Sequence, residues 1–241
     1  MKARTLITAA VALACAVTIL AAPTRAAKRG PVGADGGAAV AKGRDAYVSI
    51  DIPARPGGTC LATAPNLQAT GSLFPPIGGK PRRWIVLELK YSTQAKWQDE
   101  LMFTWHVLLD SSKATDKDPK NLPPLLSYYT TTVRYVDVRK GSHMASVCLP
   151  PSVYERFGEP CTVSVLVTNK EGDELAFRTE NQWSKLPTGG NGKWWENDKL
   201  MSWQDQKKDG KQGLERRQGL LDRSKTPFYL VNNADYELVQ Q

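Results

Sequence analysis

Residues 84–91 are Trp-Ile-Val-Leu-Glu-Leu-Lys-Tyr, and the side chains of Val86–Tyr91 largely alternate between apolar and polar. Successive side chains of a β-strand point to opposite faces, so a period of two is typical of a strand with one buried face. Residues 101–109, Leu-Met-Phe-Thr-Trp-His-Val-Leu-Leu, are more continuously apolar, which is typical of a central strand covered on both faces. These two stretches predict a chain built mainly from β-strands.

Strand-like runs and turn signals continue on both sides of these stretches. Two Gly-containing segments, 139–141 and 169–173, have the composition of hairpin turns. The further strands that we expect are Tyr47–Ile52, Tyr128–Val138, Ser142–Leu149, Cys161–Thr168, Glu174–Arg178, Pro227–Val231 and Tyr236–Val239. This series of short strands with little helix predicts an all-β protein with an immunoglobulin-like β-sandwich fold.

Only two segments favour a helix, so we expect one or two short helices. Ser152 and Glu155 fit a capping box, and Gly158 is placed to end a single short helix after Phe157. This capped turn would carry the chain from one sheet of the sandwich to the other. Residues 198–208 are the second candidate helix.

Residues 1–26 have the organisation of a signal peptide. Lys2 and Arg4 form a basic start, Leu6–Ala22 is an apolar run, and small residues precede a cleavage point after Ala26. The apolar run is also at the lower limit of what spans a bilayer, so a retained anchor stays open. Either way, we expect an exported protein in the periplasm or at the cell surface, touching the membrane only through this segment if it is uncleaved.

The rest of the chain divides by composition. Residues 27–44 are rich in Gly and Ala without apolar periodicity, which predicts a flexible linker. Residues 45–241 are expected to form a single β-sandwich domain. A long polar loop, residues 182–226, interrupts this domain before its last strands, and loops of this length are usually functional or disordered.

Cysteine and charge give weaker indications. Cys15 would leave with the signal, unless it is a lipid-attachment site, and an exported chain with Cys60, Cys148 and Cys161 can form one disulfide. We expect the pair Cys148–Cys161, and whether Cys60 is free stays open. The formal net charge of the whole chain is +8, a surplus that ordinary soluble domains also show.

The sequence offers little for catalysis. His106 and His143 are the only histidines, and His106 lies in the most apolar predicted strand, where a structural role is expected. There is no His-Glu-x-x-His, Cys-x-x-Cys or Gly-x-Ser-x-Gly motif, and no cofactor or metal is predicted. Paired carboxylates have no short signature, so a glycan-acting site stays open. Nucleic acid is not an expected partner of an exported protein without a basic, aromatic groove.

The long loop is the candidate contact region. Aromatic residues on loops supply rigid contact area for proteins and flat faces for sugars, or they pin the loop to the domain. Seven basic and three acidic residues follow in 207–225, which we interpret as a solvated, partly disordered loop. Contact of this stretch with an acidic partner or a membrane surface stays open. The candidate contact residues are Trp183, Trp194, Trp195, Trp203, Lys207, Lys208, Arg216 and Arg217.

Three stretches carry a resemblance to a known family: residues 84–91, residues 96–103 (Lys-Trp-Gln-Asp-Glu-Leu-Met-Phe) and residues 162–168 (Thr-Val-Ser-Val-Leu-Val-Thr). Together they resemble the pilus-like exported proteins that accompany type IV pilus-type assembly genes in the planctomycete–verrucomicrobial group. The resemblance implies an immunoglobulin-like fold and a non-enzymatic role linked to pilus assembly. The chain lacks the Gly cleavage site and the acidic residue that a fibre-forming pilin needs, which favours an accessory component.

The sequence therefore predicts an exported, non-catalytic protein that acts through protein–protein contact in a pilus-like or cell-envelope assembly. The alternative is a carbohydrate-binding module or glycan-acting envelope protein that uses the loop tryptophans. Protein partners are expected, and glycan partners stay open.

Overall fold

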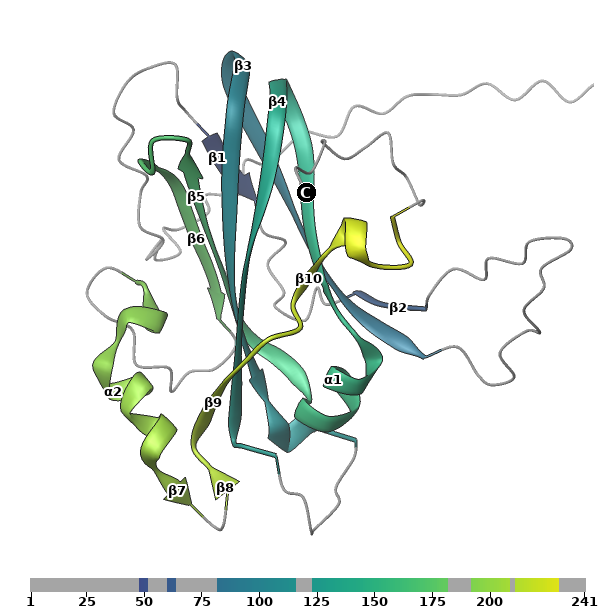
Figure 1. Cartoon of the computed structure of the whole chain (residues 1–241), viewed down its shortest axis with the longest axis vertical. Coiled ribbons are helices and arrows are strands. Elements are labelled where there is room, and N and C mark those ends of the chain that lie inside the picture. Colours follow the sequence, from purple (N-terminus) through teal and green to yellow (C-terminus); the bar gives the residue numbers. More distant parts are fainter. Residues whose placement is uncertain are drawn as a thin grey trace, which may run out of the picture. The chain divides into compact units, whose positions relative to one another are not determined.

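The computed structural model describes residues 48–51, 60–63, 82–115, 123–181, 192–208 and 211–229 (Figure 1). All of them belong to one compact unit, residues 36–241. The predicted signal, the predicted linker, Trp183 and the strand expected at Tyr236–Val239 lie outside the described residues.

Two long strands, β3 (Arg83–Asp110) and β4 (Leu126–Leu149), form the centre of the fold. They pair antiparallel from one end to the other, with one register shift between Thr93 and Trp97. At this shift the hairpin folds over, and the rings of Tyr91 and Phe103 on the two halves of β3 meet with 4.8 Å between their centres. The two stretches predicted as separate strands, 84–91 and 101–109, are therefore the two halves of one bent strand (Figure 1).

Strand β4 bends at the same level. Asp137 has φ 54° and Gly141 has φ 145°, and both angles lie in the region that L side chains avoid. Strict alternation is interrupted within this bend, because Tyr135 and Val138, three residues apart, both belong to the core. The hairpin turn predicted at 139–141 is wrong: these residues lie inside β4 and bend it without ending it.

The bent hairpin gives the sandwich its two layers, so one continuous sheet faces itself. In the first layer, the N-terminal half of β3 pairs with β1 (Val48–Asp51) and β2 (Cys60–Thr63), and the C-terminal half of β4 pairs with β10 (Leu221–Asp222). In the second layer, the other halves of β3 and β4 pair with β5 (Glu159–Asn169) and β9 (Leu214–Arg217), and β6 (Glu174–Asn181) follows β5.

The core lies between the layers and is built from alternate residues of each strand. Its largest fully buried side chains include Trp105, Tyr129, Tyr135, Phe103 and Ile85. Alternation is what the period of two in the sequence predicted. The all-β sandwich prediction is confirmed.

Helix α1 (Pro151–Phe157) carries the chain from the first layer to the second, as expected for the turn between the strands of Cys148 and Cys161. Gly158 ends it, with φ 82° and its N–H donating to the carbonyl of Tyr154. The predicted capping box is wrong, because the helix starts two residues earlier than an N-cap at Ser152 would allow, after Pro150, and has no side-chain cap. Glu155 instead pairs with Arg82, with 3.3 Å between the charged atoms.

The predicted disulfide between Cys148 and Cys161 is also wrong: both are free, buried thiols. Cys148 pairs with Val86 in the first layer, on the face opposite the core residues Val147 and Leu149. Cys161 lies on the outer face of the second layer, and its thiol donates to the carbonyl of Leu108 at 3.3 Å. The two sulfurs thus point away from each other with the whole core between them, far beyond disulfide reach.

Smaller elements complete the fold. The β5–β6 turn is a hairpin as predicted, with Asn169 N–H donating to the Asp173 carbonyl and Gly172 at φ 86°. Residues 227–229, expected to begin a strand, form a turn. The remaining elements are α2 (Asp198–Met201), β7 (Lys207–Lys208), β8 (Lys211–Gln212) and the 3-10 turns Ser111–Lys113, Trp194–Glu196, Ser202–Asp205 and Arg223–Lys225.

Candidate functional site

The first part of the predicted polar loop that the structure describes, residues 192–206, lies on the outer face of the second layer, and we call it the docked segment. Trp194 and Leu200 are both 0% exposed and anchor it. They pack against Leu108, Tyr128 and Cys161, which are the outward-facing residues of β3, β4 and β5. This second apolar cluster explains why the central strands look apolar on both faces in the sequence.

Trp194 is fixed by a hydrogen bond as well as by packing. Its indole Nε1 donates to Ser164 Oγ at 2.7 Å, and Ser164 Oγ lies 2.7 Å from Thr179 Oγ1 on β6. A buried indole N–H needs such an acceptor, so the polar residues of β5 and β6 complete the pocket for this ring. Trp194 therefore holds the docked segment to the sheet and is not available to a partner.

Trp195 stacks on the outward-facing histidine of β3. Its ring lies parallel to the His106 imidazole, with 3.8 Å between ring centres, and His106 Nδ1 is 2.7 Å from the Tyr128 hydroxyl. Burial, together with the charge of Lys193, lowers the pKa of His106 to about 4. The imidazole is thus neutral at pH 7 and has the structural role that the sequence predicted.

The end of the docked segment is built from short turns. Asn197 caps α2, with its side-chain oxygen accepting from the N–H groups of Lys199 and Leu200 at 3.0 and 3.4 Å. The helix expected over 198–208 is therefore shorter, and a 3-10 turn that carries the half-buried Trp203 follows it.

The second part of the predicted loop, together with residues 227–229 that follow it, covers the free edge of β4, and we call residues 211–229 the closing segment. Strand β9 runs parallel to β4 at residues 126–129 in the second layer. Strand β10 then pairs with residues 147–148 in the first layer (Figure 1). Leu214 and Leu220 are buried. The prediction of a solvated, partly disordered loop is wrong for these residues, because their leucines are buried and the backbone of β9 and β10 pairs with β4.

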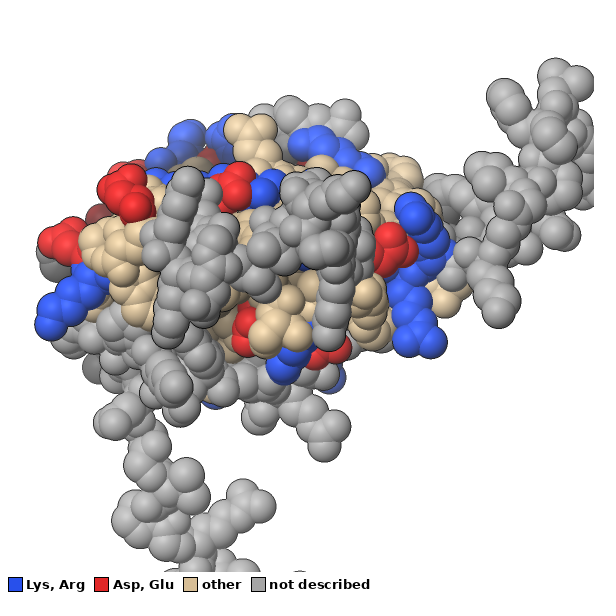
Figure 2. All heavy atoms as spheres, turned by 90° about the horizontal axis from the view of Figure 1, so that it is seen from below, with Lys and Arg blue, Asp and Glu red and all other residues tan. Residues whose placement is uncertain are grey.

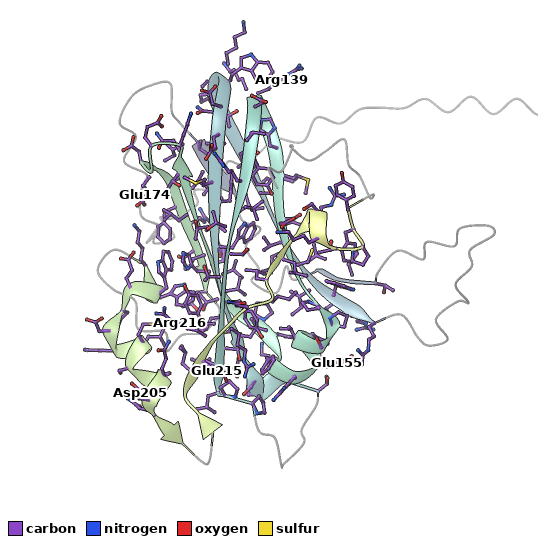
Figure 3. The ribbon with its side chains drawn as sticks, in the orientation of Figure 1. Arg139, Glu155, Glu174, Asp205, Glu215 and Arg216 are labelled. Carbon is purple, nitrogen blue, oxygen red and sulfur yellow. The ribbon has the colours of Figure 1, made fainter. Side chains whose placement is uncertain are left out.

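The predicted contact residues differ in how exposed they are in the structure. Arg216 is exposed, with its guanidinium 5.7 Å from the Tyr128 ring centre and donating to the Met201 sulfur at 3.4 Å (Figure 3). Arg217 is half-buried, pairs with Glu215 at 2.6 Å and lies over the Phe157 ring. Trp194 is buried, and Trp195 and Trp203 are half-buried. Lys207 and Lys208 lie in β7, but their side chains are outside the described part of the structure, as is the whole of Trp183.

One exposed aromatic residue was missed by the sequence reasoning. Trp97 is 47% exposed at the bend of the central hairpin, and the Arg139 guanidinium lies 5.0 Å from its ring centre. The signal available in the sequence was its polar surroundings, Lys96-Trp97-Gln98-Asp99, which are unlike those of the buried strand tryptophan Trp105.

Charged side chains of both signs share the described surface. On the face drawn in Figure 2, basic and acidic side chains are interspersed. Among the described residues, no group of three or more His, Cys, Asp or Glu side chains is arranged to hold a metal ion. None of the helices in the described ranges is long and apolar enough to cross a membrane.

Comparison with known proteins identifies relatives of this fold. No curated protein matches the sequence. Two chains of solved structures match. One is the crystal structure of a protein from Akkermansia muciniphila, with a TM-score of 0.54 and 19% sequence identity over 81% of this chain and 93% of that chain. At this identity the likeness shows a shared fold.

A protein-family model matches residues 64–241. The match takes in 178 of the 241 residues, and it spans the central hairpin, the docked segment and the closing segment. The chain therefore belongs to this family.

Proposed function

We propose that this chain is an exported, non-catalytic protein that acts through protein–protein contact in a pilus-like or cell-envelope assembly. Its place would be the periplasm or the cell surface. The family match and the sandwich shared with the A. muciniphila protein support the proposal. That organism belongs to the Verrucomicrobia, the group to which the sequence resemblance points.

The observation that carries the proposal is the firm packing of the docked segment on the sheet. Trp194, Leu200 and Trp195 fix it to the sheet, so its outward side keeps one geometry without a partner. The exposed Lys199 and Arg216 lie on that side of the second cluster. A preformed surface loses little conformational entropy on binding, which is the condition for stable protein contact.

The carbohydrate alternative has less support. A sugar stacks on a free aromatic face, but Trp194 is 0% exposed and one face of Trp195 is covered by His106 at 3.8 Å. We therefore expect glycans to leave the fluorescence of these two tryptophans unchanged. Their quenching by a glycan would favour the alternative.

Photocrosslinking in the native envelope tests the proposal. A photoreactive amino acid at position 199, which is exposed and close to the docked anchor Leu200, should give discrete crosslinked protein bands. The same amino acid at position 170, exposed on the β5–β6 turn, is the matched control. Bands at 199 that are absent at 170 support contact through the docked segment, and no discrete bands at either position would contradict the proposed function.

Point substitutions are better suited to this test than removal of residues 182–226. The structure shows that such a deletion would remove Trp194, Leu200 and Leu214, all 0% exposed, together with both strands that cover β4. Lys199→Glu changes charge without touching these groups, and it should weaken the crosslinks formed from a neighbouring position such as 202.

A further inference from the structure

The bend of the central hairpin presents a second surface, made of Lys96, Trp97, Arg139 and Lys140, which we call the bend surface. Trp97 and Arg139 are cross-strand partners at the register shift of β3 and β4. The guanidinium lies 5.0 Å from the indole centre, within cation–π range. Figure 3 shows Arg139 at the end of the hairpin, away from α1 and Glu155.

The backbone under this surface is held firmly. The carbonyl of Arg139 accepts hydrogen bonds from Thr93 Oγ1 at 2.6 Å and from His143 Nε2 at 2.7 Å. Thr93 is buried, and the His143 ring packs against Tyr91 with 5.1 Å between centres. The exposed indole and guanidinium are therefore displayed on a fixed frame, so binding would not need to order the bend.

The positive charges of the bend surface differ from those of three arginines elsewhere on the sandwich. Arg134, Arg178 and Arg217 each pair with a glutamate. Among the described residues, no carboxylate forms an ion pair with Lys96, Arg139 or Lys140, all of which are exposed. A guanidinium that stacks on an indole still has its N–H edges available for a carboxylate.

We propose that the bend surface docks a protein segment that carries a carboxylate beside an apolar side chain. Arg139 would bind the carboxylate, and Trp97 would contact the apolar group. Tryptophan and arginine are the residue types that contribute most to protein interfaces. The inference rests on the proposed function as a contact protein, and it names a site and a partner chemistry that the docked segment does not supply.

An acidic protein segment fits this surface better than an anionic membrane. The exposed Asp99 and Asp137 lie in the same bend as the cationic residues. A lipid leaflet of uniform negative charge would be repelled by these two carboxylates, whereas a peptide with a single carboxylate brings only one negative charge near them.

Fluorine NMR of the full chain labelled with 5-fluorotryptophan tests the proposal. Trp97→Phe identifies the Trp97 resonance by removing it. The probes are a short synthetic peptide in which a single Glu is flanked by Leu residues (the Leu–Glu peptide) and a matched peptide with Gln in place of this Glu (the Leu–Gln peptide). We expect the Leu–Glu peptide to shift the Trp97 resonance saturably, and the Leu–Gln peptide to bind at least about tenfold more weakly because it cannot form charge-assisted hydrogen bonds.

Two substitutions sharpen this test. Arg139→Gln should weaken the binding of the Leu–Glu peptide about tenfold, while the hydrogen bonds to the backbone carbonyl of residue 139 stay in place. Arg178→Gln removes one positive charge from β6, where Arg178 pairs with Glu180, and should leave binding unchanged. Circular dichroism confirms that both variants fold.

Three results would overturn the inference. They are equal shifts with both peptides, no shift of the Trp97 resonance, or a shift with phosphatidylglycerol vesicles alone. The outcome is separable from that of the proposed function. If crosslinks from position 199 persist while the peptides fail to bind, the chain is a contact protein without a docking site at the bend.

Discussion

At the scale of single residues, His106 shows how an outward-facing polar side chain becomes part of the structure. It lies between Tyr128 and Trp195, in a place that the docked segment closes off from water. The fold favours its neutral form, which lowers the pKa from 6.5 to about 4. Its contribution to stability is therefore complete above pH 6.5 and is lost as the pH falls from 6.5 towards 4.

We predict that the free energy of unfolding falls by up to about 3 kcal/mol over this pH window on account of His106. His106→Asn keeps a polar group near the Tyr128 hydroxyl but cannot titrate, so its stability should vary less with pH. Urea denaturation at a series of pH values for both proteins measures this difference. Parallel pH profiles would show that His106 is not the group responsible.

The two buried cysteines give a second prediction at this scale. Burial raises the pKa of both Cys148 and Cys161 to about 12, so neither thiol is ionised at neutral pH. We expect both to resist iodoacetamide in the native protein and to react fully in denaturant. Peptide mass spectrometry assigns each site, and a Cys148–Cys161 disulfide in a non-reducing digest would contradict the structure.

At the scale of elements, the joint between α1 and β5 depends on Gly158. A Cβ at this position would lie 2.1 Å from the carbonyl oxygen of Asp110, at the end of β3, and φ is 82°. We predict that Gly158→Ala lowers stability by at least about 2 kcal/mol, since it combines backbone strain with a clash.

Gly172 is the matched control for this substitution. It has φ 86°, but nothing lies within 4 Å of its Cβ position. Gly172→Ala should therefore lower stability by about 1 kcal/mol, from backbone strain alone. Thermal unfolding of the two variants separates the cost of backbone strain from the cost of the clash. Equal losses of stability would show that the close approach to Asp110 is not decisive.

The closing segment provides the other prediction for an element. Leu214 is fully buried in the second apolar cluster, beside β4 and the docked segment. Leu214→Ala should lower the free energy of unfolding by about 2–5 kcal/mol, whereas Arg217→Gln on the same strand, which removes a half-buried ion pair with Glu215, should change it much less. A small effect of Leu214→Ala in urea denaturation would mean that the closing segment is only loosely attached.

At the scale of the whole molecule, the fold follows from one hairpin that bends over itself. Because β3 and β4 contribute to both layers, neither layer has a core of its own. The outer cluster shares β3, β4 and β5 with the inner one. Residues that look independent in the sequence, such as those of the docked segment and α1, are thus connected through the same two strands.

The local pattern was sufficient for the strands. Alternation in 84–91 and 162–168 and the turn residues at 169–173 predicted elements that the structure contains, because the direction of a strand side chain and the turn preference of glycine are local properties. The apolar run at 101–109 likewise indicated burial on both faces. Of the candidate contact residues, Arg216 is exposed and Trp194 is buried, and Trp194 pins the loop to the domain, which is one of the alternatives that the sequence left open.

The wrong predictions concern features that depend on contacts between distant parts of the chain. Sequence reasoning placed a turn where β4 bends, paired two cysteines that face opposite sides, and missed the exposed Trp97.

By itself, the sequence determined most of the strand residues of the sandwich core and which of their faces are apolar, since both follow from the backbone period. Only the tertiary structure decided that the long strands bend together, that the polar loop covers β4, and that Trp194 is buried while Trp97 is exposed. The physical reason is that these outcomes depend on which surfaces meet, and strand pairing brings together residues far apart in the chain.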